Sequence, residues 1–98
     1  MVAANTQSGP RFSLGQIVAT PGALAAFEEA GQLPMAFLRR HVLGDWGMVC
    51  SADAAANDDA VRQGERILSA YMLGTGTKIW IITEADRSAT TLLLPEEY

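Results

Sequence analysis

Residues 78–98, KIWIITEADRSATTLLLPEEY, indicate the fold because they hold two apolar runs separated by the polar segment TEADRS (83–88). Both runs are rich in β-branched, aromatic and aliphatic residues, which is typical of β-strands. A similar run, RILSAYML (66–73), precedes them, and GTGT (74–77) and ADRS (85–88) have the composition of hairpin turns. The sequence therefore predicts a three-stranded antiparallel meander.

The middle strand of this meander is expected to be central, because both of its faces are largely apolar. Successive side chains of a strand point to opposite faces. One face would carry Ile79, Ile81 and Thr83, and the other Lys78, Trp80, Ile82 and Glu84. We expect helices to cover at least one of these faces.

Two short helices are predicted before the meander. TPGALAAFEEAG (20–31) begins with Thr20 as a capping residue and Pro21 at the first helical position, and Gly31 can end it in a left-handed conformation. A second helix is predicted over PMAFLRRHV (34–42), which also begins with proline.

A third helix and a strand complete the predicted elements. The alanine-rich stretch AAANDDAVRQ (54–63) predicts a helix capped by Ser51 or Asp53 and closed by Gly64. Near the N-terminus, FSLGQIVA (12–19) predicts a short strand that can join the meander as a fourth.

The order of these elements predicts an α+β fold, with the helices grouped together and the antiparallel strands grouped together. A chain of 98 residues has room for one domain, which we place at residues 12–98. Residues 1–11 are small and polar, and we expect a flexible leader there.

Composition limits the classes of partner. Seven basic residues against eleven acidic ones give a net charge of −4, so direct binding to nucleic acid through many phosphate contacts is not expected.

The single cysteine, Cys50, cannot form an internal disulfide, which favours a reducing, cytoplasmic setting. No stretch resembles a signal peptide or a membrane span, so we expect no membrane association.

Four segments, GQIVATPGAL, RHVLGDWG, GERILSAY and KIWIITEADRSATTLLLPEEY, together resemble a family of small bacterial proteins of plasmids and other mobile elements. Some members of that family are labelled type I restriction modification subunits. The resemblance indicates the kind of genes that lie near those of the family, and it does not indicate a reaction. A methyltransferase would need a glycine-rich turn from strand to helix, whereas the GTG of this chain (74–76) lies between two predicted strands.

His41, Asp45 and Trp46 are candidate functional residues in the middle of the chain. His41 is the only histidine and can act as a general acid or base, although a lone helical histidine more often bonds local groups. With one histidine and no suitably spaced acids, we expect no metal or other cofactor. Asp45 and Trp46 lie between glycines and can form an exposed recognition tip, or an Asx-turn with Trp46 folded onto the core.

The segment TEADRS contains the other candidates, Glu84, Asp86 and Arg87. Together with His41 and Arg66, Glu84 and Arg87 would supply the base, acid and cations of a metal-independent ribonuclease. The plain alternative is a turn in which Asp86 and Ser88 bond local backbone while Glu84 pairs with Arg87 in solvent.

Three hypotheses follow. The first is an acidic interaction protein of mobile elements that binds a host or element protein, modulating restriction or CRISPR-type defence; its carboxylates would engage a basic surface of the partner. Those carboxylates belong to Asp53, Asp58, Asp59, Glu96 and Glu97. The second is a ribonuclease-like enzyme that uses His41, Arg66, Glu84 and Arg87. The third is a homodimeric regulatory or structural subunit that pairs through an exposed sheet edge.

Overall fold

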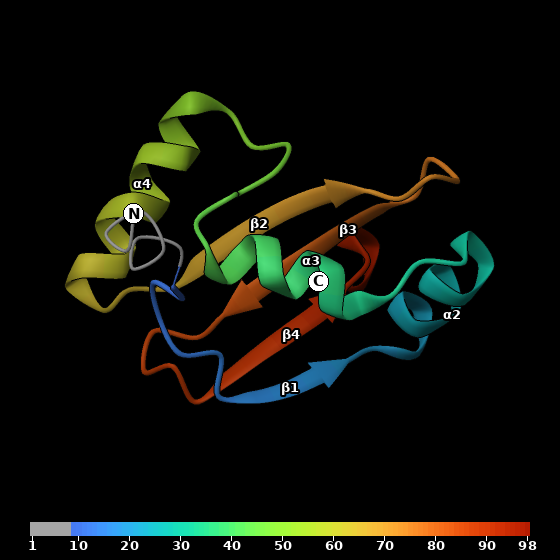
Figure 1. Cartoon of the computed structure of the whole chain (residues 1–98), viewed down its shortest axis with the longest axis horizontal. Coiled ribbons are helices and arrows are strands. Elements are labelled where there is room, and N and C mark those ends of the chain that lie inside the picture. The colour runs from blue at the N-terminus through green and yellow to red at the C-terminus, as the bar shows by residue number, and fades with distance from the viewer. Residues whose placement is uncertain (1–8) are drawn as a thin grey trace, which may run out of the picture.

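A four-stranded mixed sheet organises the chain, and helices pack against it, so the predicted α+β class is confirmed (Figure 1). The structure is a computed structural model that describes residues 9–98; most of the predicted leader lies outside this range. The strands are β1 (Gln16–Ala19), β2 (Ile67–Met72), β3 (Lys78–Thr83) and β4 (Ala89–Leu93). The helices are α2 (Pro21–Ala30), α3 (Pro34–Val42), α4 (Ser51–Gln63) and the 3₁₀ turn η1 (Pro95–Glu97).

The strand order is β1-β4-β3-β2, which confirms the meander and the added fourth strand. β2, β3 and β4 pair antiparallel, whereas β1 runs parallel to β4. The long connection between β1 and β4 contains all three helices and the first two strands of the meander. β1 and β2 are therefore the two edge strands.

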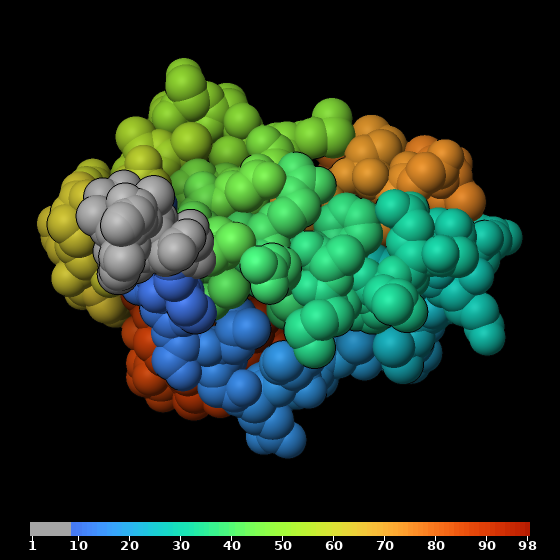
Figure 2. All heavy atoms as spheres, viewed as in Figure 1, coloured from blue at the N-terminus to red at the C-terminus, as the bar shows by residue number. Residues whose placement is uncertain are grey.

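The two faces of the sheet have different coverings. On the helix face, Ile79, Ile81 and Thr83 are fully buried, and they share that face with Tyr71 and Leu92 beneath α2 and α3. In Figure 1, α3 crosses in front of the strands. Figure 2, from the same side, shows the sheet almost hidden, apart from β1 along the lower edge.

The second face of the sheet carries Leu68, Trp80 and Ile82, and η1 lies against β3 there. The ring of Tyr98 meets that of Trp80 edge-on, with 5.7 Å between the centroids. None of the helices within residues 9–98 has the length and apolar character needed to cross a bilayer.

The helix boundaries follow the predicted capping residues in α2 but only partly in α4. The Thr20 hydroxyl accepts a hydrogen bond from the Ala23 amide at 3.1 Å, and Gly31 ends α2 with φ of 66°. Gly64 closes α4 in the same left-handed conformation. The predicted cap at Ser51 or Asp53 is wrong, because α4 begins at Ser51 after Cys50, whose side chain makes no capping bond.

β1 is shorter than the predicted strand over residues 12–19. Gly15 has φ of 64°, which breaks the extended backbone before Gln16. A side chain there would meet the carbonyl oxygens of Arg87 and Ser88, so the chain passes directly against the turn before β4. Phe12 instead packs on Trp46, with ring centroids 6.1 Å apart.

Candidate functional site

His41 lies in the core and has no exposed surface. Its Nδ1 is 2.5 Å from the Ser69 hydroxyl, and its Nε2 is 2.9 Å from the Thr83 hydroxyl. Thr83 in turn contacts Thr90 at 2.8 Å, and the Thr90 hydroxyl donates to the carbonyl oxygen of Leu14 at 2.7 Å. This chain of contacts, from Ser69 to Leu14, is called the His41 network below.

The end of the His41 network determines the proton positions along it. A hydroxyl has one proton, and Thr90 gives its proton to Leu14, so Thr83 must donate to Thr90. Thr83 then accepts from Nε2–H of His41, and Nδ1 accepts from Ser69. Every polar atom is satisfied by the neutral Nε2–H form of the ring.

Burial lowers the pKa of His41 from 6.5 to about 4, because the charged ring would lose its hydration. The ring is therefore neutral near pH 7, and both nitrogens are occupied. A general base needs access to the proton that it removes. His41 has no such access, which disfavours the ribonuclease hypothesis for this residue.

Arg87 also bonds within the fold. Its guanidinium donates to the carbonyl oxygens of Glu65 at 2.6 Å and Ala60 at 2.9 Å, past the end of α4. It also reaches the carbonyl oxygens of Glu84 and Ala85 at 3.1 and 3.3 Å. The predicted Glu84–Arg87 pair is therefore wrong in detail, because Arg87 bonds the main chain of Glu84 and no ion pair joins their side chains among the described residues.

The rest of TEADRS forms the turn between β3 and β4. The Arg87 amide donates to the Glu84 carbonyl at 2.9 Å, and Arg87 has φ of 61°. The Asp86 carboxylate accepts from the Ser88 amide at 3.0 Å, and hydrogen bonds from Ser88 hold its pKa below the usual range. Glu84 and Asp86 are exposed. The local bonds of Arg87 to Glu84 and of Ser88 to Asp86 account for the turn.

The structure separates His41 from the other residues of the enzyme hypothesis. The His41 network lies on the helix face, whereas the guanidinium of Arg66 stacks over Tyr98 at 5.2 Å on the second face. Glu84 lies on β3's second face, one residue past the strand end. The antiparallel register of β2 and β3 brings Arg66 opposite Glu84 on that face, but His41 is enclosed on the other face and Arg87 is bonded to four carbonyl oxygens.

Of the two alternatives for Asp45 and Trp46, the structure agrees with the Asx-turn and with Trp46 folded onto the core, and it does not show an exposed tip. Asp45 pairs with Arg40 at 2.7 Å and accepts from the Gly47 amide at 3.2 Å, as in an Asx-turn. The hydrogen bond from Arg40 holds the pKa of Asp45 below its usual value. Trp46 is only 5% exposed, and its indole N–H donates to Asp58 at 3.1 Å.

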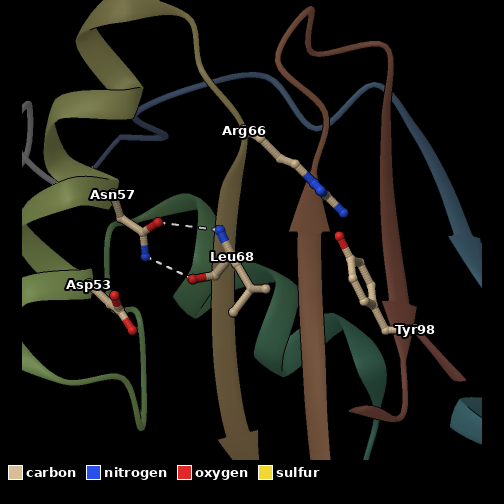
Figure 3. Close-up of a pocket in the computed structure, with 5 residues that line it drawn as sticks. All are labelled: Asp53, Asn57, Arg66, Leu68 and Tyr98. Atoms are coloured by element: carbon tan, nitrogen blue, oxygen red, sulfur yellow. Dashed lines mark hydrogen bonds between the residues drawn. The ribbon is translucent and has the colours of Figure 1, made fainter. Parts of the chain in front are cut away.

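A pocket of about 260 Å³ opens on the second face, between α4 and the C-terminal turn (Figure 3). It is lined by Asp53, Asn57, Arg66, Leu68 and Tyr98. Figure 3 shows Arg66 and Tyr98 pointing toward each other, and Asn57 bonded to the main chain of Leu68. Asp53 and Arg66 are exposed side chains on its rim, and no group of three or more potential metal-ligating side chains occurs in residues 9–98.

The hypotheses drawn from the sequence included an exposed sheet edge but did not locate it; the structure places it at β1. Gln16–Ala19, called the β1 edge below, is the outermost strand of the sheet, and Ile17 and Val18 are 45% and 44% exposed. The stretch QIVA contains no charge and no proline, although these are the residues that usually protect an edge strand. The lack of charged residues and proline in QIVA was the sequence signal that could have located the exposed edge.

Comparisons of the chain with protein-family models, with curated proteins and with solved structures gave no match. The assignment of function therefore depends on the geometry described above.

Proposed function

We propose that this chain is an acidic interaction module that works by binding a partner protein and has no catalytic role. The observation that carries the proposal is that the side chains suited to catalysis are hydrogen-bonded within the fold, whereas one edge of the sheet is exposed. The groups best suited to catalysis, His41 and Arg87, are bonded to other groups of the fold, while within residues 9–98 the outer side of the β1 edge has no partner strand.

The distribution of charge supports a basic partner. Among the seven cationic side chains, Arg11, Arg40 and Arg62 form ion pairs with aspartates, and Arg87 bonds carbonyl oxygens. The acidic side chains outnumber the cations, so the surface retains a net negative potential that attracts a basic surface and repels nucleic acid. The partner class suggested by the resemblance, a host or mobile-element protein of restriction or CRISPR-type defence, stays a prediction.

Affinity purification from the native host, followed by quantitative mass spectrometry, tests this proposal. The chain is tagged and expressed near its natural level, and Leu33→Lys serves as a surface control because Leu33 is 73% exposed and lies outside β1. We expect one protein or a small set to be enriched with both forms.

Catalysis would be revealed by a separate assay on purified chain with RNA. The proposal predicts no cleavage above that of an Arg66→Ala, Glu84→Gln double variant. RNA cleavage that disappears in this variant would support the enzyme hypothesis instead. That conclusion would be stronger if repeated purifications also enriched no specific protein.

A further inference from the structure

We propose that the β1 edge binds an extended segment of the partner protein in which basic residues flank an apolar centre, so that the segment joins the sheet as a fifth strand. This inference rests on the proposed function and assigns it a surface and a class of ligand.

The two edges of the sheet differ in how they are closed. Along β2, the Ala70 amide donates to the Trp46 carbonyl at 3.1 Å, and the Ala70 carbonyl accepts from the Met48 amide at 2.6 Å. The Asn57 side chain satisfies Leu68 from both sides, donating to its carbonyl at 2.8 Å and accepting from its amide at 3.3 Å. The main-chain groups of Leu68 and Ala70, which face away from β3, are therefore already hydrogen-bonded, and a further strand cannot pair with them.

Among the residues that the structure describes, nothing closes the β1 edge in this way. The amides of Gln16 and Thr20 donate inward, to the carbonyls of Ser88 at 2.9 Å and Leu92 at 3.0 Å. Because alternate residues of a parallel strand face the same neighbour, Ile17 and Ala19 turn their N–H and C=O groups outward. The exposed side chains of Ile17 and Val18 point to opposite faces and add apolar surface on both sides of this edge.

Carboxylates lie at both ends of the β1 edge. At its start, the Gln16 amide donates to the carbonyl oxygen of Ser88, and the Ser88 amide donates to the carboxylate of Asp86. At its end, the hydroxyl of Thr20 donates to the carboxylate of Glu97 at 2.5 Å, and this bond holds the pKa of Glu97 below its usual value. The four-residue strand between these two ends spans about 13 Å.

This arrangement selects a basic segment over a second copy of the chain. The cation nearest in sequence, Arg87, points its guanidinium at the carbonyls beyond α4 rather than at Asp86. In an antiparallel pair of two β1 edges, Asp86 of each copy would approach Glu97 of the other, and like charges would oppose pairing at both ends. A segment with lysine or arginine on either side of an apolar centre meets these carboxylates instead.

A phage-displayed library of random peptides, selected on the wild-type protein, tests the inference without knowledge of the natural partner. We expect enriched peptides to alternate β-branched residues and to carry lysine or arginine at their flanks. A synthetic copy of an enriched peptide then serves as the probe for measuring Kd by fluorescence anisotropy.

The discriminating variant is Ile17→Pro. It removes an outward N–H and leaves the inward bonds of Gln16 and Val18 to β4, so the fold should persist, which circular dichroism would verify. We expect at least about a tenfold loss of affinity with Ile17→Pro and none with Leu33→Lys. Asp86→Asn should weaken binding by about two- to fivefold and reduce its dependence on salt.

Three results would overturn the inference. The first is equal binding of the enriched peptides to wild type and to Ile17→Pro, and the second is enrichment of acidic flanks or of no peptide. The third is a dimer in sedimentation that Ile17→Pro dissociates, which would assign the edge to a second copy. If the partner captured from the host is retained by Ile17→Pro, the edge assignment fails while the proposed function stands.

Discussion

The imidazole of His41 is held between Ser69 and Thr83, and each polar atom from Ser69 to the Leu14 carbonyl has a partner. The network joins α3 to β2, β3, β4 and the segment before β1, so one buried side chain links elements that are distant in the sequence. Burial of a hydrogen-bonded histidine in place of an apolar residue makes the packing of these elements specific and sensitive to protonation.

Acidification is expected to destabilise the protein between pH 6.5 and about 4. The pKa of His41 is about 4 in the folded chain and 6.5 as the ordinary value, so the unfolded chain binds more protons in this window. Stability therefore rises with pH through the window and is constant above it as far as His41 is concerned. The full contribution is about 3 kcal/mol, measurable by urea unfolding at several pH values.

The nitrogen shifts of His41 provide an independent check by ¹⁵N NMR. They should report a neutral ring protonated on Nε2 at pH 6. Titration of His41 with a midpoint near 6.5 in the folded protein would contradict the buried network. The carboxylates with lowered pKa, Asp45, Asp86 and Glu97, act at lower pH because their ordinary values are near 4.

Replacing Thr83 by valine is expected to cost about 1–3 kcal/mol of stability. The substitution keeps the shape but leaves Nε2–H of His41 without an acceptor and Thr90 without a donor. Thr91→Val is the matched control, since Thr91 lies on the opposite face of the sheet and is only partly buried. Chemical denaturation of both variants measures the difference, and equal losses would show that the network adds no stability.

At the scale of elements, the turns and helix ends could largely be predicted from the sequence, because the residues that determine them act locally. Thr20 and Gly31 bound α2, and GTGT and TEADRS form hairpin turns, as expected from their composition. The contacts of Arg87 with Ala60 and Glu65, and the parallel pairing of β1 with β4, depend on segments distant in sequence. No local pattern encodes those contacts.

The closure of β2 gives a test at this scale. Gly47 has φ of 74°, and a Cβ there would collide with the Ala70 carbonyl and the ring of Tyr71. Gly47→Ala should therefore cost about 2–4 kcal/mol, from backbone strain together with displacement of this segment.

Gly31→Ala is the control for Gly47→Ala, because Gly31 has φ of 66° but open space around it. It should cost only about 1–2 kcal/mol, from strain alone. Thermal unfolding of both variants would separate the two contributions. Equal losses would show that the close approach of Gly47 to β2 does not matter for stability.

For the whole molecule, the two sheet edges and the distribution of charge are the features that bear on function. One edge is closed by Met48, Trp46 and Asn57, and the other, within the described part of the chain, is open, apolar and flanked by carboxylates. Exposed uncharged edge strands promote aggregation unless a partner uses them. An unprotected edge in a chain that closes its other edge is consistent with selection for binding.

Composition alone led to the hypothesis of an acidic interaction protein but indicated no surface for the proposed binding. The candidate residues in the sequence were the polar ones, such as His41 and Arg87, and these were bonded in the core or to the main chain. Main-chain groups at an edge have no sequence signature beyond the absence of protecting residues. Their role becomes visible only when the strand order is known.

Hydrogen exchange of the β1 edge amides, resolved by NMR, tests the central claim most directly. In the free protein, the amides of Ile17 and Ala19 should exchange much faster than those of Gln16, Leu68 and Ala70, which are bonded. Addition of the enriched peptide or the captured partner should slow Ile17 and Ala19 specifically. Protection of these two amides in the free protein, or protection elsewhere with no change at β1 on binding, would contradict the account.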